Sequence, residues 1–510
     1  MPARVRTVAF HGVEVIDVEA QVTFTAGLPA FALVGLPDKA VAESRERVRA
    51  ALASLGLGLP PKRITVNLAP ADVVKEGSHF DLPIALGLLA AMEALPADEL
   101  GFYTALGELA LDGSLTGVAG VLLAALAAAG RGSGVICPAA CGGEAAWAGE
   151  VEIIAAPSLL AIVNHFKGTQ LLPPPEPRIV PSRSAGLDLV DVKGQESAKR
   201  ALEIAAAGGH NLLMVGPPGS GKSMLAARLP GILPPLEPAE ALELGMIQSV
   251  AGGLRSGGLS RERPFRDPHH SASLAALVGG GPRARPGEIS LAHQGVLFLD
   301  ELPEFRRNVL EALRQPLEDG VVTLSRAAVS VSFPARFMLA AAMNPCPCGH
   351  HGDLVRPCRC EPVAIERYRA RVSGPLLDRI DIHLPVPAVP AGDLTLGAAP
   401  GEASASIRAR VEAARRMQRE RFRGRAGVHA NAHMSSRDVR RFCPLAEPAE
   451  ALLRRAMATL GLSARAWVRV LKLARTIADL TGVLEIAPAH VSEAIQYRSL
   501  DRVSMAGARR

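Results

Sequence analysis

A glycine-rich octapeptide near the middle of the chain has the residue types needed to hold the phosphates of a nucleotide. It reads Gly216, Pro217, Pro218, Gly219, Ser220, Gly221, Lys222 and Ser223. In such a loop the glycines let backbone N–H groups curl around phosphate oxygens, and the following helix N-terminus favours anionic charge. Lys222 would reach the β- and γ-phosphates, and the Ser223 hydroxyl would ligate Mg²⁺. The octapeptide therefore predicts a site for ATP and Mg²⁺.

An acidic pair further along the chain could complete a hydrolytic site. Asp300 and Glu301 directly follow the apolar run 296–299. Asp300 would hold Mg²⁺, and Glu301 would polarise the water that attacks the γ-phosphate. Asn344 ends a second apolar run, 337–343, and could orient the same water. A catalytic carboxylate next to a metal-binding one predicts hydrolysis rather than nucleotide binding alone.

Two arginines have the chemistry to neutralise charge on the transferred phosphoryl group. Arg379 follows a helix-like stretch in GPLLDRID and would suit the γ-phosphate bound by a neighbouring subunit. Arg465 begins a helix in LSARAWVRVLKLAR and could contact the same phosphate from the C-terminal region. A surface salt bridge is the alternative for each arginine. Together they describe an oligomeric ATPase.

Four of the seven cysteines lie close together as C-x-C, nine residues, C-x-C. They are Cys346, Cys348, Cys358 and Cys360. In a reducing cytoplasm such a set is better explained as thiolate ligands than as disulfides, and four thiolates would form a closed tetrahedral Zn²⁺ site. His350 or His351 could replace one ligand, and metal-free reduced cysteines are the alternative. Zinc here would stiffen an insertion near the pore or the ATP site.

The elements that must position these residues alternate along the chain after a Pro-rich segment at 171–181. Apolar strands such as 211–215 and 296–299 alternate with helical stretches, which predicts a parallel sheet covered by helices. Before that segment, strand-like runs at 13–24 and 64–68 and helix-like runs at 39–55 and 82–94 predict an α+β domain. A second break at 384–401 precedes a helical C-terminal third.

Length and composition agree with several globular domains. The chain has 510 residues, of which 48% are apolar and 21% charged, and this length predicts about three domains. No run approaches the roughly 18 apolar residues of a membrane span, and no signal-peptide core follows the first basic residues. We expect a soluble cytoplasmic protein with no membrane partner.

The net charge of +6 is unevenly distributed. Residues 401–510 carry 21 basic and 10 acidic side chains, a net charge of +11, which leaves −5 for the rest. This asymmetry points to a polyanionic partner, and only 4% aromatic residues favour phosphate contacts over base stacking. A solvated Arg-rich helix is the alternative. Eight arginines cluster in this region: Arg408, Arg410, Arg415, Arg416, Arg419, Arg421, Arg423 and Arg425.

Nearly the whole chain resembles the Mg-chelatase-like branch of the AAA+ ATPases, in the ComM/YifB family. The most specific stretches are RPFRDPHHSAS (263–273), RPGEISLAHQGVLFLDELPEF (285–305), RQPLEDG (314–320), AAMNPCPCG (341–349) and SGPLLDRIDIH (373–383). The resemblance assigns Walker A to Lys222 and Ser223, Walker B to Asp300 and Glu301, sensor 1 to Asn344, the trans arginine finger to Arg379 and sensor 2 to Arg465. It implies hexameric rings with ATP sites between subunits, and helicases that extend branches of DNA joints during natural transformation.

The resemblance also implies an α/β fold with three domains and a linker. It predicts a Lon-protease-like α+β domain at 1–170, a Pro-rich linker at 171–185 and a C-terminal helical lid at 391–510. Between the linker and the lid, an AAA+ core with a parallel sheet and flanking helices spans 186–390 and carries the Cys-rich insertion 344–362.

Hairpins that line the pore in related ring helicases suggest where DNA would bind. Residues 321–326 and 329–333 could pair as one hairpin, and the long interval before Asp300 holds the PHH segment. Arg326, His269 and His270 are therefore the DNA-contact candidates. The alternative is a solvated arginine and two structural histidines.

The Lon-like N-terminal domain raises the question of peptidase activity. That family uses a serine activated by a lysine. Aligning KEGSHFD with the nucleophile loop places His79 near the serine position, and the lysine position falls near Leu122; Ser78 and Lys75 lie in another register. We expect a non-proteolytic relative that serves assembly or DNA binding.

Three functions follow from these patterns. The first is a homo-hexameric ATP-driven motor that remodels branched or duplex DNA. The second is a chelatase-type motor that acts on a protein or a tetrapyrrole enzyme. The third, ATP-dependent proteolysis, predicts casein cleavage that Ser78→Ala would abolish, and we expect no cleavage.

Overall fold

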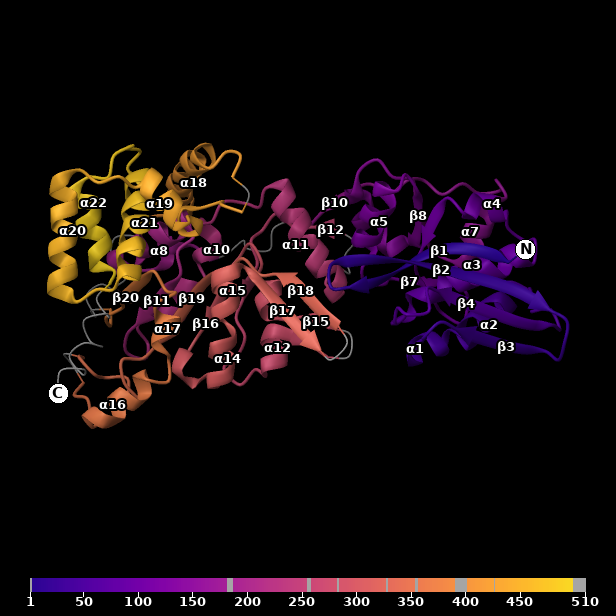
Figure 1. The fold of residues 1–510 in the computed structure, drawn as a ribbon, viewed down its shortest axis with the longest axis horizontal. Coiled ribbons are helices and arrows are strands. Elements are labelled where there is room, and N and C mark those ends of the chain that lie inside the picture. The colour runs from indigo at the N-terminus through magenta and orange to yellow at the C-terminus, as the bar shows by residue number, and fades with distance from the viewer. Residues whose placement is uncertain are drawn as a thin grey trace.

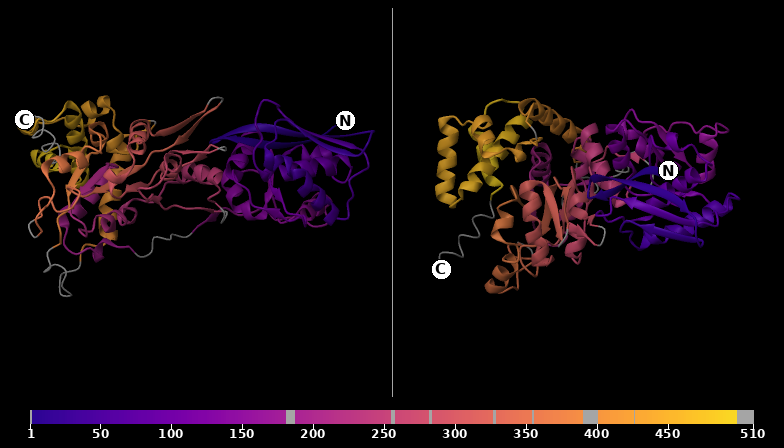
Figure 2. Two further views of the ribbon diagram at one scale, coloured as in Figure 1. Left: turned by 90° about the horizontal axis from the view of Figure 1, so that it is seen from below. Right: turned by 45° about the vertical axis from the view of Figure 1, so that its right-hand side comes forward.

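The chain forms an elongated molecule with two sheet-containing domains and a helical region at the C-terminal end. The computed structural model describes residues 2–180, 187–254, 258–281, 284–326, 329–353, 356–389, 401–425 and 427–498. The N-terminal domain lies at one end, the C-terminal helices lie at the other, and the second sheet lies between them (Figure 1). Figure 2 shows the same order from two further directions.

The N-terminal domain is built on a mixed seven-stranded sheet of order β3-β4-β2-β1-β5-β8-β9. Its strands are β1 (Ala3–His11), β2 (Glu14–Thr25), β3 (Ala30–Val34), β4 (Arg63–Ala69), β5 (Tyr103–Ala105), β8 (Gly134–Pro138) and β9 (Ile153–Ala156), and β6 (Glu108–Leu109) pairs with β7 (Leu115–Thr116). Its helices are α1 (Lys39–Ala42), α2 (Ser44–Ser54), α3 (Asp81–Ala91), α4 (Ala97–Leu100), α5 (Val121–Gly130), α6 (Gly142–Ala145) and α7 (Leu159–Phe166). Because α3 is apolar on nearly all sides, it is buried from Asp81 to Ala90 against the sheet.

The central domain contains a parallel five-stranded sheet of order β13-β16-β19-β11-β20. The strands are β11 (Leu212–Val215), β13 (Phe265–Arg266), β16 (Val296–Leu299), β19 (Met338–Met343) and β20 (Ile382–Pro385). Every residue of β16 and β19 is buried, as expected for strands covered on both faces. Parallel strands end at the same edge, so the residues that follow β11, β16 and β19 lie together.

Helices and short strands surround this sheet. The helices are α8 (Glu196–Gly208), α9 (Lys222–Ala226), α10 (Leu229–Ile232), α11 (Pro238–Ala251), α12 (Leu274–Val278), α13 (Glu288–Leu291), α14 (Arg307–Ala312), α15 (Arg314–Asp319), α16 (Pro362–Arg369) and α17 (Gly374–Leu377). An antiparallel hairpin of β17 (Val321–Arg326) and β18 (Val329–Pro334) and a short pair of β14 (Gly279–Gly280) and β15 (Arg285–Pro286) complete it.

In the described residues from 401 onward, five α-helices form the C-terminal region. They are α18 (Ser404–Arg421), α19 (Ser436–Phe442), α20 (Glu447–Leu460), α21 (Ala464–Leu480) and α22 (Pro488–Gln496). They share one apolar core with α8 and one face of the parallel sheet, in which Leu212, Val411 and Ile477 are buried together. The mixed α/β architecture, the parallel sheet and the helical C-terminal region confirm the predicted fold class.

The two sheet domains are in direct contact. Within the Pro-rich segment, β10 (Arg178–Ile179) pairs in parallel with β12 (Gly258–Leu259). The Ser249 hydroxyl on α11 donates to the buried Glu144 carboxylate on α6, and burial raises the pKa of that carboxyl. The turn between β1 and β2 packs on the β17–β18 hairpin. The approach is so close that a Cβ added to Gly12 would lie 2.5 Å from Val331 Cγ1. The N-terminal domain is thus fixed to α11 and to the hairpin.

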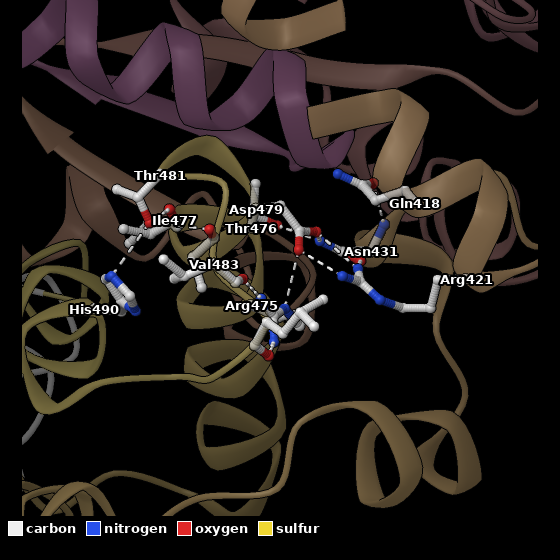
Figure 3. Close-up of polar contacts among 12 residues, drawn as sticks. Gln418, Arg421, Asn431, Arg475, Thr476, Ile477, Asp479, Thr481, Val483 and His490 are labelled. Atoms are coloured by element: carbon white, nitrogen blue, oxygen red, sulfur yellow. Dashed lines mark hydrogen bonds and ion pairs between the residues drawn. The ribbon is translucent and has the colours of Figure 1, made fainter. Parts of the chain in front are cut away.

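The Arg-rich run of α18 and the loop after it is mostly paired within the chain. Arg415 is half-buried and donates to the Ala206 carbonyl oxygen, and its partial burial lowers the pKa of its guanidinium group to about 9. Arg421 forms an ion pair with buried Asp479, which Arg475 and Asn431 also contact (Figure 3). Partners also hold five others: Arg408, Arg410, Arg419, Arg423 and Arg425. Most of these arginines therefore have partners within the chain.

No helix in the described ranges is both long and apolar enough to cross a membrane.

Candidate ATP site and cysteine cluster

The glycine-rich loop connects β11 to α9 and has the backbone shape of a phosphate cradle. Gly219 and Gly221 have φ angles of +77° and +87°, a region that side chains disfavour. A Cβ added to Gly216 would lie 2.0 Å from the Val386 carbonyl oxygen, so this position accepts only glycine. The loop and the first turn of α9 together present backbone N–H groups at one edge of the sheet.

Lys222 is held over this loop. Its Nζ donates to the carbonyl oxygens of Gly216 and Pro217, each at 2.8 Å, and lies 3.3 Å from Asn344 Oδ1. Burial lowers the pKa of the ammonium group, while the charges of Asp300 and Glu301 act in the opposite direction. The structure therefore brings the lysine, the acidic pair and Asn344 together as the sequence predicts.

The acidic pair lies at the carboxyl end of β16. Ser223 Oγ donates to Asp300 Oδ2 at 2.6 Å, so two oxygen atoms that suit Mg²⁺ are adjacent. Glu301 has a φ of +52°, and its exposed carboxylate lies 3.4 Å from His270 Nδ1. Nothing in the spacing of the sequence indicated that His270 would lie beside Glu301.

These residues surround one cavity of about 390 Å³. It is lined by Pro218, Gly219, Gly221, Lys222, Ser223, Met224, Asp300, Glu301, Met343 and Asn344. Met224 and Met343 were not singled out from the sequence, because an apolar lining residue has no motif. The cavity combines a cationic donor, a pair of hard oxygen ligands and a carboxylate that can accept a proton from water.

The two candidate phosphate-sensing arginines do not line this cavity. Arg379 donates to the Pro375 carbonyl oxygen and forms an ion pair with Glu318 on α15. Arg465, at the start of α21, lies 3.5 Å from the Asp378 carboxylate and is 69% exposed. The structure thus places both arginines next to each other in the fold, because Asp378 directly precedes Arg379.

The four cysteines come together after β19. Cys346 Sγ lies 3.4 Å from Cys348 Sγ and 3.7 Å from Cys358 Sγ, and all four sulfurs lie within 4.8 Å of one another. Sulfur ligands of a tetrahedral Zn²⁺ with bonds of about 2.3 Å are about 3.8 Å apart, so the spacing fits. Backbone N–H groups of Arg359 and His350 lower the pKa of the Cys348 thiol to about 6, which favours the thiolate ligand.

The histidines near the cluster are not part of it. Among the described residues, the group that could hold a metal consists of the four cysteines alone. His350 Nδ1 instead pairs with the Asp353 carboxylate at 3.1 Å. Replacement of a thiolate by His350 or His351, which the sequence left open, is not supported by this geometry.

The DNA-contact candidates separate into two places. His269 and His270 pack against each other with tilted rings whose centroids are 4.1 Å apart. His269 Nδ1 contacts Ser271 Oγ at 2.8 Å, and His270 faces Glu301. His270 therefore lies beside the ATP site. Arg326 ends β17 at the tip of the hairpin, and its side chain lies outside the described residues.

The described residues of the N-terminal domain do not assemble a serine–lysine pair. Ser78 Oγ donates to Glu108 Oε2 at 2.5 Å, whereas the buried Lys75 ammonium donates to the Pro70 carbonyl. His79 is buried, and its Nε2 lies 2.8 Å from the Val8 carbonyl oxygen. Leu122 packs against Leu254 and Leu259 of the central domain in a small apolar cluster. The described contacts offer no lysine to activate the serine.

Comparison with known proteins agrees with this geometry. Three family models match: "Magnesium chelatase, subunit ChlI" over residues 188–394, "Subunit ChlI of Mg-chelatase" over 18–141 and the ChlI C-terminal model over 401–498. Protein YifB of Escherichia coli is 47% identical over 98% of this chain and 97% of its own length. Competence protein ComM of Haemophilus influenzae is 47% identical over 97% of each chain.

The chain belongs to the ComM/YifB family of Mg-chelatase-like AAA+ ATPases. Membership implies ATP and Mg²⁺ as ligands of the cavity, in agreement with its residues. The likeness to chelatase subunits is narrower. The magnesium-chelatase 38 kDa subunit of Rhodobacter capsulatus is 28% identical over 32% of this chain and 50% of its own length.

Proposed function

We propose that this chain is the subunit of a ring-shaped ATPase whose ATP sites lie between neighbouring subunits. The observation that supports this most is the separation of Lys222, which lines the cavity, from Arg379, which does not. In a ring the same two surfaces meet at every interface, so an arginine remote from its own cavity can face that of the next subunit. Arg465 lies beside Arg379 and would approach the same phosphate. The family resemblance favours six subunits.

The chemistry proposed for the cavity divides among its residues. When bound to Ser223 and Asp300, Mg²⁺ would neutralise charge on the phosphate oxygens. Lys222 would exchange the loop carbonyls for phosphate oxygens, because its ammonium group already lies at the loop. Glu301 would accept the proton of the attacking water, and Asn344 would orient that water.

Mixing two inactive variants tests whether the site is shared. Lys222→Ala removes the phosphate ligand, and Arg379→Ala removes the proposed trans contact. Each variant alone should hydrolyse almost no ATP, but in a one-to-one mixture about one quarter of the interfaces combine an intact loop with an intact arginine. Recovery of roughly that share of activity supports the proposal. No recovery in rings shown by co-purification of two tags to be mixed would contradict it.

We further propose that the motor acts on branched or duplex DNA. Support comes from the relative named competence protein ComM, which matches 97% of this chain. The hairpin β17–β18, with Arg326 at its tip, and the His269 segment are candidate DNA elements. The ATPase rate should rise with a branched joint more than with single-stranded DNA or without DNA. Equal rates in all three conditions would remove the support for DNA.

A chelatase-type motor acting on a protein or tetrapyrrole enzyme is the second candidate. The name of the matching family models favours it. Against it, the chelatase subunit matches only 32% of this chain, whereas YifB and ComM match 97% or more. DNA stimulation of ATP hydrolysis separates the two candidates.

We propose that the cysteine cluster is a structural Zn²⁺ site. Its support is the set of sulfur distances given above. Protein purified under reducing conditions should contain about one zinc per chain by elemental analysis, and Cys358→Ser should lose it. Wild-type protein that neither contains zinc nor takes it up would rule out the site.

A further inference from the structure

One glycine of the cysteine loop lies directly against the phosphate-binding loop. Gly349 follows Cys348 and has a φ of +84°. Its backbone N–H donates to the Cys346 carbonyl oxygen at 3.0 Å, which closes a tight turn. A Cβ added to Gly349 would lie 2.4 Å from Pro218 Cδ and 2.7 Å from Cγ. The turn that carries two of the sulfurs therefore forms a wall behind the loop that would hold the phosphates.

The sulfurs hold this turn to the rest of the insertion. Two of them come from the segment 346–348 and two from 358–360, and the Cys348 sulfur accepts hydrogen bonds from the backbone N–H groups of His350 and Arg359. A metal bound by all four would join the two segments at the point where the turn meets Pro218. Among the described residues, the contacts that join the two segments without it are weak hydrogen bonds to sulfur.

The other end of the insertion is joined to the ATP site as well. The cluster begins two residues after Asn344, whose side chain lies 3.3 Å from Lys222 Nζ. The Asn344 backbone is hydrogen-bonded to the Tyr368 hydroxyl, and Arg369 Nε donates to the Pro345 carbonyl oxygen at 3.1 Å. The insertion thus contacts the nucleotide cavity at Asn344 and at Pro218.

We infer that metal bound by the four cysteines positions the phosphate-binding loop, so that occupancy of this site sets nucleotide affinity. The inference rests on the proposed zinc and ATP sites. Gly349 and Pro218 act as positioning residues: neither has a side chain that could coordinate the metal, but their contact transmits the geometry of the cluster to the loop. Loss of the metal should weaken ATP binding without unfolding the sheet, whose core lies elsewhere.

Two glycines of the same loop provide a matched pair of variants. Gly349 and Gly352 have φ angles of +84° and +83°, so alanine is equally strained at both. An added Cβ meets Pro218 at Gly349 but nothing within 4 Å at Gly352. Both variants keep all four cysteines. Nucleotide affinity is measured with a fluorescent ATP analogue, zinc content by elemental analysis and folding by thermal unfolding.

The expected result is that Gly349→Ala keeps its zinc and binds the analogue about tenfold more weakly than Gly352→Ala, because the loop must move to relieve the contact. A second measurement on wild-type protein covers the case in which Gly349→Ala does not fold. Removal of zinc with a nitrogen-donor chelator that spares Mg²⁺ should weaken binding by a similar factor, and added zinc should restore it.

Each outcome bears on a different proposal. Equal affinities of the two glycine variants, or unchanged wild-type affinity after zinc removal, overturn the inference while the ATP site stands. Wild-type protein that does not bind the analogue at all overturns the proposed ATP site instead.

Discussion

The buried carboxylate of Asp479 should contribute more to stability than most other ion pairs of the C-terminal region. Its side chain is fully buried and accepts hydrogen bonds from both Nη atoms of Arg421, from Arg475 Nε at 3.1 Å and from Asn431 Nδ2 at 2.8 Å (Figure 3). The side chains of the two arginines are only 11% and 3% exposed. Asp479→Asn keeps the size of the side chain but leaves two guanidinium groups without a counter-charge.

Breaking a buried pair by removing one partner costs about 3–5 kcal/mol, and we expect Asp479→Asn to destabilise the helical region by that amount. Urea denaturation can follow this region through the fluorescence of Trp467 on α21, in a background where the other tryptophan, Trp147, is phenylalanine. Glu450→Gln, which disrupts the exposed pair with Arg454, is the control and should leave the urea midpoint unchanged. If both variants unfold at the same urea concentration, the account of the arginines as an internal framework is wrong.

Three other predictions concern the motor. Lys222→Ala should abolish binding of a fluorescent ATP analogue, because it removes the ammonium group from the loop. Glu301→Gln should still bind ATP and accumulate assembled rings, while hydrolysis falls by about 10²–10⁴-fold; a wild-type rate would show that another group activates water. Gly12→Ala should reduce DNA stimulation of the ATPase but keep the basal rate, since its Cβ would displace the hairpin; Gly56→Ala, where the Cβ meets nothing, is the control.

Local sequence determined the elements of the ATP site well. The apolar run 296–299 is the whole of β16. The octapeptide forms the loop between a strand and a helix, and its glycines permit the left-handed backbone of this loop. The hairpin at 321–334 and the grouping of four cysteines were also foreseen, since short spacings limit where these residues can lie. The expected helix at 39–55 divides at Glu43 into α1 and α2.

Contacts between distant segments could not be foreseen in the same way. Charge counts do not tell which arginines have partners, and Arg415 and Arg421 are paired with groups far along the chain. The approach of His270 to Glu301 and of Gly349 to Pro218 depends on how separate loops meet at one sheet edge. Such positions carry no local pattern, so only the three-dimensional structure shows them.

Conversion of a three-stranded DNA joint by the purified full-length chain tests the proposed function most directly. We predict that the wild-type protein extends the branch in the presence of ATP and Mg²⁺, and that it fails to do so without ATP. Glu301→Gln should bind the joint but leave the branch where it is. Wild-type protein that hydrolyses ATP yet never moves the branch, on this or on a forked substrate, would contradict the proposal of a DNA motor.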